Sequence, residues 1–280
     1  MNSLTRHLSA VVVLAFFGAR VHSYEAWIVI SEGSRDFLVH ATGSSVVKVA
    51  SLGDLTLFAN TDSKIGILTR DKAMQSGKLV IVDKKTAAID ESIPVLVYPA
   101  SQLSGATDDL ILMGDEAYFV SVRFSSDPTR IDPNALGGAF DLTIVSTKSG
   151  SVASIPLPRE ARNPRVFRDG SKILVAGGPN SGAWEFDIGS RTMHDAAPNP
   201  HSSQIANREA DAYIAAENTP ASKAAVGAIK SLPDESKVFV DSTSGMIEML
   251  LPDGKAVDLW DISSAIPESS PSATRVIDFH

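Results

Sequence analysis

Cysteine is absent from the 280 residues of this chain. Its absence excludes disulfide bonds, thiolate metal ligands and cysteine nucleophiles. The chain also lacks an Asn-x-Ser/Thr sequon, the acceptor of N-linked glycans. Secreted animal proteins commonly use both features, so their joint absence favours a bacterial periplasmic or secreted protein. The packing of the core must then hold the fold together unaided.

Basic residues are fewer than acidic ones, 25 against 33, and the formal net charge is −8. Binding to nucleic acid or to an anionic membrane surface needs clustered Lys and Arg side chains that neutralise phosphates. The composition therefore predicts no nucleic-acid partner. A net charge of this size is ordinary for a soluble protein, and it leaves a protein partner or a small ligand open.

Long hydrophobic runs are absent as well, and the longest apolar stretch near the start covers residues 10–17. It follows Arg6 and His7 and is followed by Val21-His22-Ser23, a pattern typical of a secretory signal peptide. A spanning helix needs about 20 apolar residues. We therefore expect a signal peptide over residues 1–23, one domain over residues 24–280, and no membrane span after cleavage.

Helical periodicity is scarce, and short runs rich in Val, Ile, Leu, Phe and Tyr alternate with turn residues instead. This pattern predicts an all-β chain. The expected strands cover residues 26–30, 37–40, 46–50, 55–58, 65–68, 79–82, 95–98, 110–113, 118–123, 140–145, 152–156, 173–176, 183–188, 212–216, 238–241, 247–251 and 256–259.

The strand–turn–strand units resemble one another: residues 36–49, 171–186 and 236–249 each join two apolar runs through a small polar turn. Grouping the strands in fours gives units at residues 25–59, 60–104, 108–157, 160–198, 203–231 and 236–262. A spacing of about 35 to 50 residues is typical of β-propeller blades, so we predict a β-propeller with roughly five to seven four-stranded blades. We expect the last run, residues 275–279, to complete the blade that residues 24–30 begin.

Two stretches resemble known blade families. KILVAGGPNSGAWEFDIGSRTM (residues 172–193) is similar to a kelch-type blade, with a double glycine after one strand and an aromatic and an acidic residue in the next. FDLTIVSTKSGSVASIPLP (residues 140–158) looks like the YVTN-type blades of bacterial secreted propellers. In such a fold Trp184 is expected to pack between blades rather than to stack on a ligand.

One long insertion, residues 125–138, separates two expected strands, whereas most of the other strands are joined by short turns. Long loops on a propeller face often bind ligands. Oxygen atoms of Asp127, Asp132, Asn134 and Asp141 could hold calcium, and Arg130 could contact an acidic partner. The spacing is not that of an EF-hand, and a solvated Asp-Pro turn is the alternative.

Histidines supply the remaining candidates. His194 and His201 lie near Asp195 and Ser202 in a stretch that we expect to be a loop, and both are candidate ligand-binding residues. The Gly-x-Ser-x-Gly and His-Glu-x-x-His motifs are absent from the sequence, so nothing fixes a catalytic geometry. His40, inside an expected strand, is predicted to have a structural role.

Three functions remain open at this point. The first is an exported propeller that acts as a scaffold and presents loops to a protein or small ligand. The alternative is a propeller enzyme, a lactonase or similar hydrolase, which the resemblance to propeller lactonases implies would use channel carboxylates and a divalent metal. A structural component of the cell envelope is the third.

If the insertion binds calcium, calcium must raise the melting temperature by the amount that mass action gives for the bound state. We expect that shift in the wild-type chain and its loss in Asp132→Ala, measured by thermal denaturation with calcium against chelator. An unchanged melting temperature in the wild-type chain would contradict the calcium site.

Overall fold

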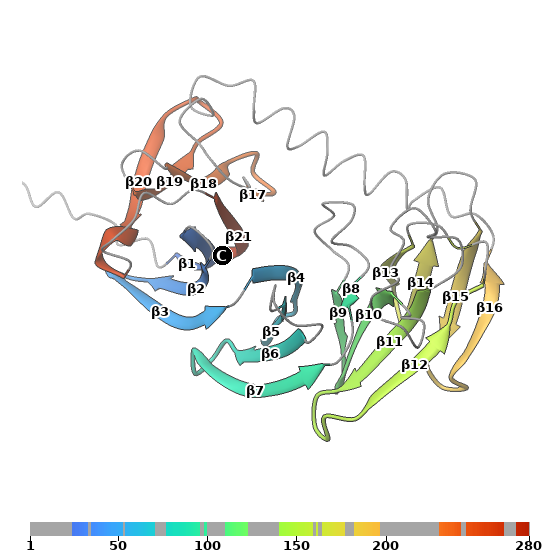
Figure 1. Ribbon diagram of the computed structural model, residues 1–280. Helices are drawn as coiled ribbons and strands as arrows, with labels where there is room; N and C mark the ends of the chain where they lie inside the picture. The colour runs from blue at the N-terminus through green and yellow to red at the C-terminus, as the bar shows by residue number, and fades with distance from the viewer. Residues whose placement is uncertain are drawn as a thin grey trace, which may run out of the picture.

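The structure is a computed structural model, and it is almost entirely built of β-strands (Figure 1). Among the residues that it describes, a single turn of 3-10 helix, η3 (Ile262–Ser264), is the helical element. No helix in this part of the chain is long and apolar enough to cross a membrane. The described residues are 24–32, 35–52, 54–70, 77–95, 98–99, 110–122, 140–158, 161, 164–176, 182–196, 230–241, 245–265 and 273–279.

The described strands form five antiparallel sheets, and in four of them all the strands are neighbours in sequence. Sheet A has the order β21 (Ala273–Phe279), β1 (Glu25–Glu32), β2 (Arg35–Thr42), β3 (Ser45–Leu52). Sheet B has β4 (Asp54–Asn60), β5 (Lys64–Arg70), β6 (Gly77–Asp83), β7 (Ala88–Val95). Sheet C has β8 (Tyr98–Pro99) and β9 (Leu110–Met113), both paired with β10 (Glu116–Val122), then β11 (Phe140–Ser146), β12 (Val152–Pro156).

The remaining two sheets have four strands each. Sheet D has the order β13 (Arg165–Asp169), β14 (Lys172–Ala176), β15 (Ala183–Asp187), β16 (Thr192–Ala196). Sheet E has β17 (Lys230–Ser231), β18 (Lys237–Asp241), β19 (Met246–Leu250), β20 (Ala256–Asp261).

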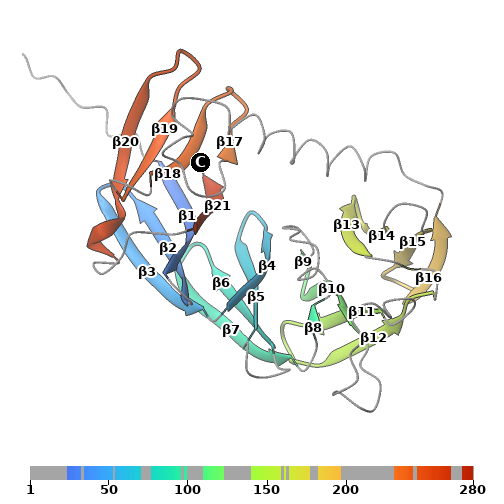
Figure 2. The same cartoon turned by 45° about the horizontal axis from the view of Figure 1, so that its top comes forward.

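The sheets follow one another along an arc in the order E, A, B, C, D (Figure 2). Four apolar clusters hold the arc together, one at each junction. Trp27 of sheet A packs in the A–B cluster with Ile65, and Phe119 of sheet C packs in the B–C cluster with Leu79. Trp184 of sheet D lies in the C–D cluster, and Trp260 of sheet E lies in the E–A cluster.

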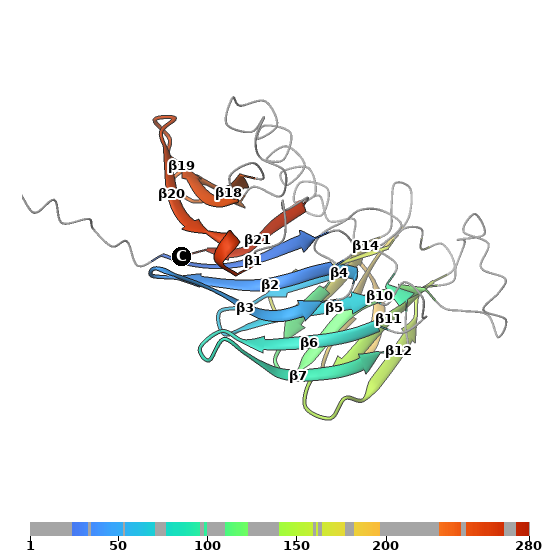
Figure 3. The same cartoon turned by 60° about the vertical axis from the view of Figure 1, so that its left-hand side comes forward.

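This arrangement is that of a β-propeller, in which each small sheet covers a face of the next. The predicted fold class is confirmed, and Trp184, 2% exposed, packs between two blades as expected. Sheet E stands steeply across the direction of the strands of sheet A (Figure 3). The Trp260 indole nitrogen donates a hydrogen bond of 3.0 Å to the Gly43 carbonyl, which ties the two sheets together.

The C-terminal strand completes the first sheet, as the sequence predicted. Strand β21 pairs antiparallel with β1, from Ala26 opposite Phe279 to Ser31 opposite Ala273. Phe279 is buried and packs against the rings of Tyr24 and Trp260, at 5.2 and 6.3 Å between centroids. In sheet A, β21 therefore takes the end position that β4 and β13 take in sheets B and D.

This closure corrects the expected blade boundaries. Because β21 fills one place in sheet A, the N-terminal segment supplies three strands, and β4 belongs to sheet B rather than to the unit at residues 25–59. Sheet B covers residues 54–95 rather than 60–104, and sheet E covers residues 230–261 rather than 236–262, whereas all four strands of sheet D lie within the expected unit at residues 160–198. The expected unit at residues 203–231 lies outside the described residues except for Lys230 and Ser231, which form β17 of sheet E.

Tight turns of sheets B, C and D gather on one side of the arc, which we call the turn face and define by residues 61–63, 84–87, 114–115, 147–151 and 170–171. The backbone nitrogen of Lys84 donates to the Ser63 carbonyl at 3.0 Å, and that of Thr147 donates to the Asp115 carbonyl at 2.8 Å. Gly114 and Gly170 have φ angles of +60° and +58°, which glycine adopts without strain. The strands thus end in short, well-bonded turns on this face.

Removing residues 273–280 should lower the melting temperature by several degrees, because sheet A loses a strand and the E–A cluster loses the Phe279 ring. Thermal denaturation followed by circular dichroism measures the effect. Phe279→Ala is the matched point variant, and we expect a smaller loss from it. A truncated chain as stable as the full one would show that β21 does not contribute to the fold.

Candidate functional site

Most of the site residues predicted from sequence lie outside the described residues: Arg130, Asp127, Asp132, Asn134 and His201. Asp141 and His194 are placed. Among the residues that the structure describes, no group of three or more His, Asp or Glu side chains could share a metal ion. The calcium site at the insertion therefore stays a prediction.

Asp141 lies on β11, directly after the insertion, and its side chain is half-buried. It stands opposite Ser121 in the sheet register. Ser121 and Thr143 are both buried and share a hydrogen bond of 2.7 Å between their hydroxyl oxygens. Because side chains two apart on a strand share a face, Asp141 and Thr143 lie on one face of sheet C.

His194 is exposed and lies on strand β16, so the expectation of a loop over residues 194–195 was wrong. Its Nε2 atom is 2.8 Å from the Thr192 hydroxyl. Successive side chains of a strand point to opposite faces, so His194 and Asp195 do not converge into an acid–base pair. The cross-strand neighbour of His194 is Glu185, whose carboxylate pairs with Lys172 at 2.7 Å.

Two polar clusters that sequence spacing could not reveal join neighbouring sheets. Glu116 accepts a hydrogen bond of 2.5 Å from the Tyr118 hydroxyl and pairs with Arg191 of sheet D. Burial, followed by the bond to Glu116, raises the pKa of Tyr118 well above its usual value, so this hydroxyl is a neutral donor. The cluster links sheets C and D rather than forming a reactive centre.

The second cluster surrounds the closing strand. Lys84, in the turn after β6, forms a nearly buried ion pair with Asp278 of β21. On the neighbouring strands the Trp27 and His40 rings stack at 4.2 Å between centroids, and Glu25 accepts hydrogen bonds from both, at 3.1 and 3.0 Å. His40 thus has the structural role that the sequence predicted.

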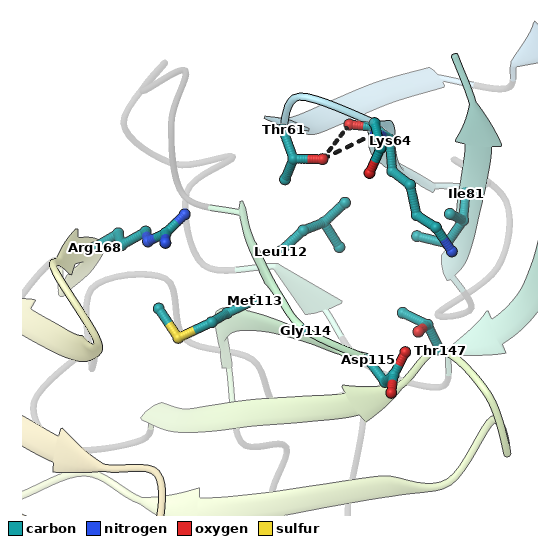
Figure 4. Close-up of a pocket in the computed structure, with 10 residues that line it drawn as sticks. Thr61, Lys64, Ile81, Leu112, Met113, Gly114, Asp115, Thr147 and Arg168 are labelled. Carbon is teal, nitrogen blue, oxygen red and sulfur yellow. Dashed lines mark hydrogen bonds between the residues drawn. The ribbon is translucent and has the colours of Figure 1, made fainter. Parts of the chain in front are cut away.

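A cavity of about 300 Å³ opens among the turns of sheets B, C and D (Figure 4). Its apolar lining comes from Ile81, Leu112 and Met113. Its polar lining comes from Thr61, Ser63, Lys64, Asp115, Thr147 and Arg168. Its volume is at the lower end of the range of small-molecule sites, and its lining is more polar than is usual for them.

The local structure explains how each sheet contributes to this cavity. Thr61 closes the β4–β5 turn, because its hydroxyl bonds the Lys64 carbonyl at 3.0 Å and accepts from the Lys64 nitrogen at 2.9 Å. Gly66 lets Leu112 approach closely, since a Cβ there would lie 2.9 Å from the Leu112 Cδ1 atom. The cavity therefore has a closely packed apolar base and a hydrogen-bonded rim.

A group of acids lies on sheet E, on the face opposite to the one that packs on sheet A. Glu248 stands beside Asp258 in the register, and Asp241 lies on the adjacent strand. Burial, followed by the charges of Asp241 and Asp258, raises the pKa of Glu248 above its usual range. The fold therefore opposes the ionised form of Glu248.

Comparisons with known proteins were made for both sequence and structure. Neither a protein-family model nor a curated protein matches the chain. Among similar solved structures, a streptogramin B lyase has a TM-score of 0.32 and 14% sequence identity, and the match covers 73% of this chain and 53% of that one. The virginiamycin B lyase of Staphylococcus aureus has a TM-score of 0.34 and 11% identity, with 85% of this chain and 70% of that one covered. The β-propeller domain of the trilobed protease of Pyrococcus furiosus has a TM-score of 0.35 and 10% identity, with 84% of this chain and 85% of that one covered.

The chain thus spans about half the length of the streptogramin B lyase. At these TM-scores the likeness carries no argument about the site. The propeller assignment rests instead on the strand order and on the apolar clusters between sheets.

The raised pKa of Glu248 predicts a pH-dependent effect of Glu248→Gln. Below about pH 4 the carboxyl is protonated in both folded and unfolded chains, so the two variants should be equally stable. As the pH rises through the folded pKa, the wild-type chain loses stability and the Gln variant does not. We expect Glu248→Gln to melt at the higher temperature at pH 7.5.

Melting temperatures at pH 4 and pH 7.5 measure this difference. Glu91→Gln, which removes the same charge from an exposed position on β7, is the control. A Gln variant that is less stable than wild type at pH 7.5, or an equal difference at both pH values, would contradict the assignment.

Proposed function

We propose that the chain is a binding scaffold that holds a small ligand in the turn-face cavity. The observation that carries this proposal is that residues from three separate sheets line one cavity of about 300 Å³. A rigid arc of packed sheets holds such residues at fixed separations, which reduces the entropy lost when a ligand binds.

Export belongs to the same proposal. A bacterial protein of the YVTN or kelch-like type, secreted or periplasmic, fits the apolar run at residues 10–17, the absence of cysteine and the two blade-like stretches. A soluble, net acidic chain fits an extracytoplasmic ligand-binding role, and a protein partner is compatible with it.

The alternative function, a hydrolase with channel carboxylates and a divalent metal, has less support. Of its four candidate ligands, Asp141 lies on β11, and Asp127, Asp132 and Asn134 lie outside the described residues. The carboxylate that lines the turn-face cavity, Asp115, is paired with Lys148 at 2.7 Å. We therefore give ligand binding precedence.

An occlusion variant tests the scaffold function. Ser63 is exposed and lines the cavity, so Ser63→Trp should fill its mouth without removing a core contact. Ser92→Trp, on the exposed outer strand β7, is the matched control. Ligand-observed NMR with a panel of small acids, amines, sugars and amides measures binding to each variant.

We expect at least one compound class to bind the wild-type chain and Ser92→Trp, with binding reduced by about tenfold or more in Ser63→Trp, since the ring displaces the ligand. If no class binds, or if binding persists in Ser63→Trp, the turn-face cavity is not the binding site.

A further inference from the structure

The charged side chains around the turn-face cavity do not balance. Lys64 is paired with Asp90, at 3.0 Å between Nζ and Oδ2. Asp115 is paired with Lys148 at 2.7 Å. Arg168 has no carboxylate partner among the described residues. Within the described part of the chain, the three charged residues that line the cavity and their partners therefore sum to one positive charge, that of Arg168.

Arg168 is held in place by its own turn. Its Nε–H donates a hydrogen bond of 3.1 Å to the Gly170 carbonyl, two residues along the chain. Figure 4 shows its guanidinium at one side of the cavity near Met113, with Leu112 in the middle and Lys64 and Asp115 on the other side. An arginine anchored through Nε still presents its two terminal nitrogens, which suit the planar carboxylate group.

The apolar part of the cavity lining favours a ligand that has a hydrocarbon portion. Leu112 is 7% exposed and Ile81 is fully buried, so this part of the lining offers hydrocarbon and no hydrogen-bonding groups. A ligand with a charge at one end and hydrocarbon at the other matches both halves. A fully polar anion such as inorganic phosphate would leave the apolar half unused.

We propose that the turn-face cavity binds a small organic carboxylate with an aliphatic chain, with Arg168 holding the carboxylate and Leu112 and Met113 contacting the chain. This inference rests on the proposed function, because it names the ligand class for the same cavity. The ligand chemistry excludes amines, which Arg168 repels, and neutral sugars, which gain nothing from the apolar base.

The two ion pairs at the rim, Lys64–Asp90 and Asp115–Lys148, set the net charge that a ligand in the cavity meets. Asp90 and Lys148 do not line it, yet each neutralises a residue that does. Asp90→Asn releases the positive charge of Lys64 and should strengthen carboxylate binding. Lys148→Gln releases the negative charge of Asp115 and should weaken it. If these two surface residues only stabilised the fold, their substitutions would not change the carboxylate affinity in opposite directions.

The experiment measures the affinity of hexanoate and of hexanamide, its neutral isostere, by titration calorimetry at low ionic strength. We expect hexanoate to bind at least tenfold more tightly than hexanamide, because hydrogen bonds to a charged group typically change affinity by about that factor. We expect Arg168→Gln to abolish this preference. Lys255→Gln, an exposed charge on the turn before β20 of sheet E, is the control and should leave it unchanged. Asp90→Asn and Lys148→Gln should shift hexanoate affinity by about two- to fivefold in opposite directions.

The outcomes separate the two proposals. If hexanamide binds as tightly as hexanoate and Ser63→Trp blocks both, the cavity is a binding site but the carboxylate class is wrong. If neither compound binds, and no member of the wider panel does, the scaffold function fails as well. Retained hexanoate preference in Arg168→Gln would overturn the role of that arginine.

Discussion

The inner sheets A, B and C of this protein bury both of their faces against neighbouring sheets, and the rest of the structure depends on that burial. Strand β1 shows it directly: Trp27 and Val29 face sheet B, while Ala26, Ile28 and Ile30 face sheet E. A sheet of four short strands cannot bury these faces alone, so stability comes from stacking neighbours. The faces of sheets D and E that no described sheet covers are mixed: Lys172 and Glu185 lie on that face of sheet D beside the buried Leu174. Glu248 lies on that face of sheet E beside the buried Phe239.

Apolar packing is not directional, so it does not by itself fix how neighbouring sheets are aligned. Polar contacts near the turn face restrict that alignment. The Lys84–Asp278 pair joins sheet B to the closing strand, and the Glu116–Arg191 pair joins sheets C and D. A nearly buried ion pair contributes specificity more than net stability. The first pair fixes a turn of sheet B against sheet A, the second fixes sheet C against sheet D, and the apolar B–C cluster holds the junction between sheets B and C. The cavity lies where residues of sheets B, C and D are brought together in this way.

The sequence predicted the strands that are buried on both faces, such as β1, β5 and β10, because short continuous apolar runs bounded by turn residues are typical of buried strands. It missed β13 (Arg165–Asp169) and β16 (Thr192–Ala196), whose charged and polar residues hide the strand pattern. The closing strand was predicted, but its consequence for the first blade, that β4 belongs to sheet B, was not. The cavity could not be predicted, because Thr61, Asp115 and Arg168 are brought together by the packing of three sheets.

Native-state hydrogen exchange tests the central claim most directly, since it reports how the inner strands open. If neighbouring sheets depend on one another for burial, the amides of β1, β5, β10 and β14 should share one opening free energy as denaturant increases, equal to that of global unfolding. Separate opening energies for each sheet, with one sheet exchanging while its neighbours stay protected, would contradict the account.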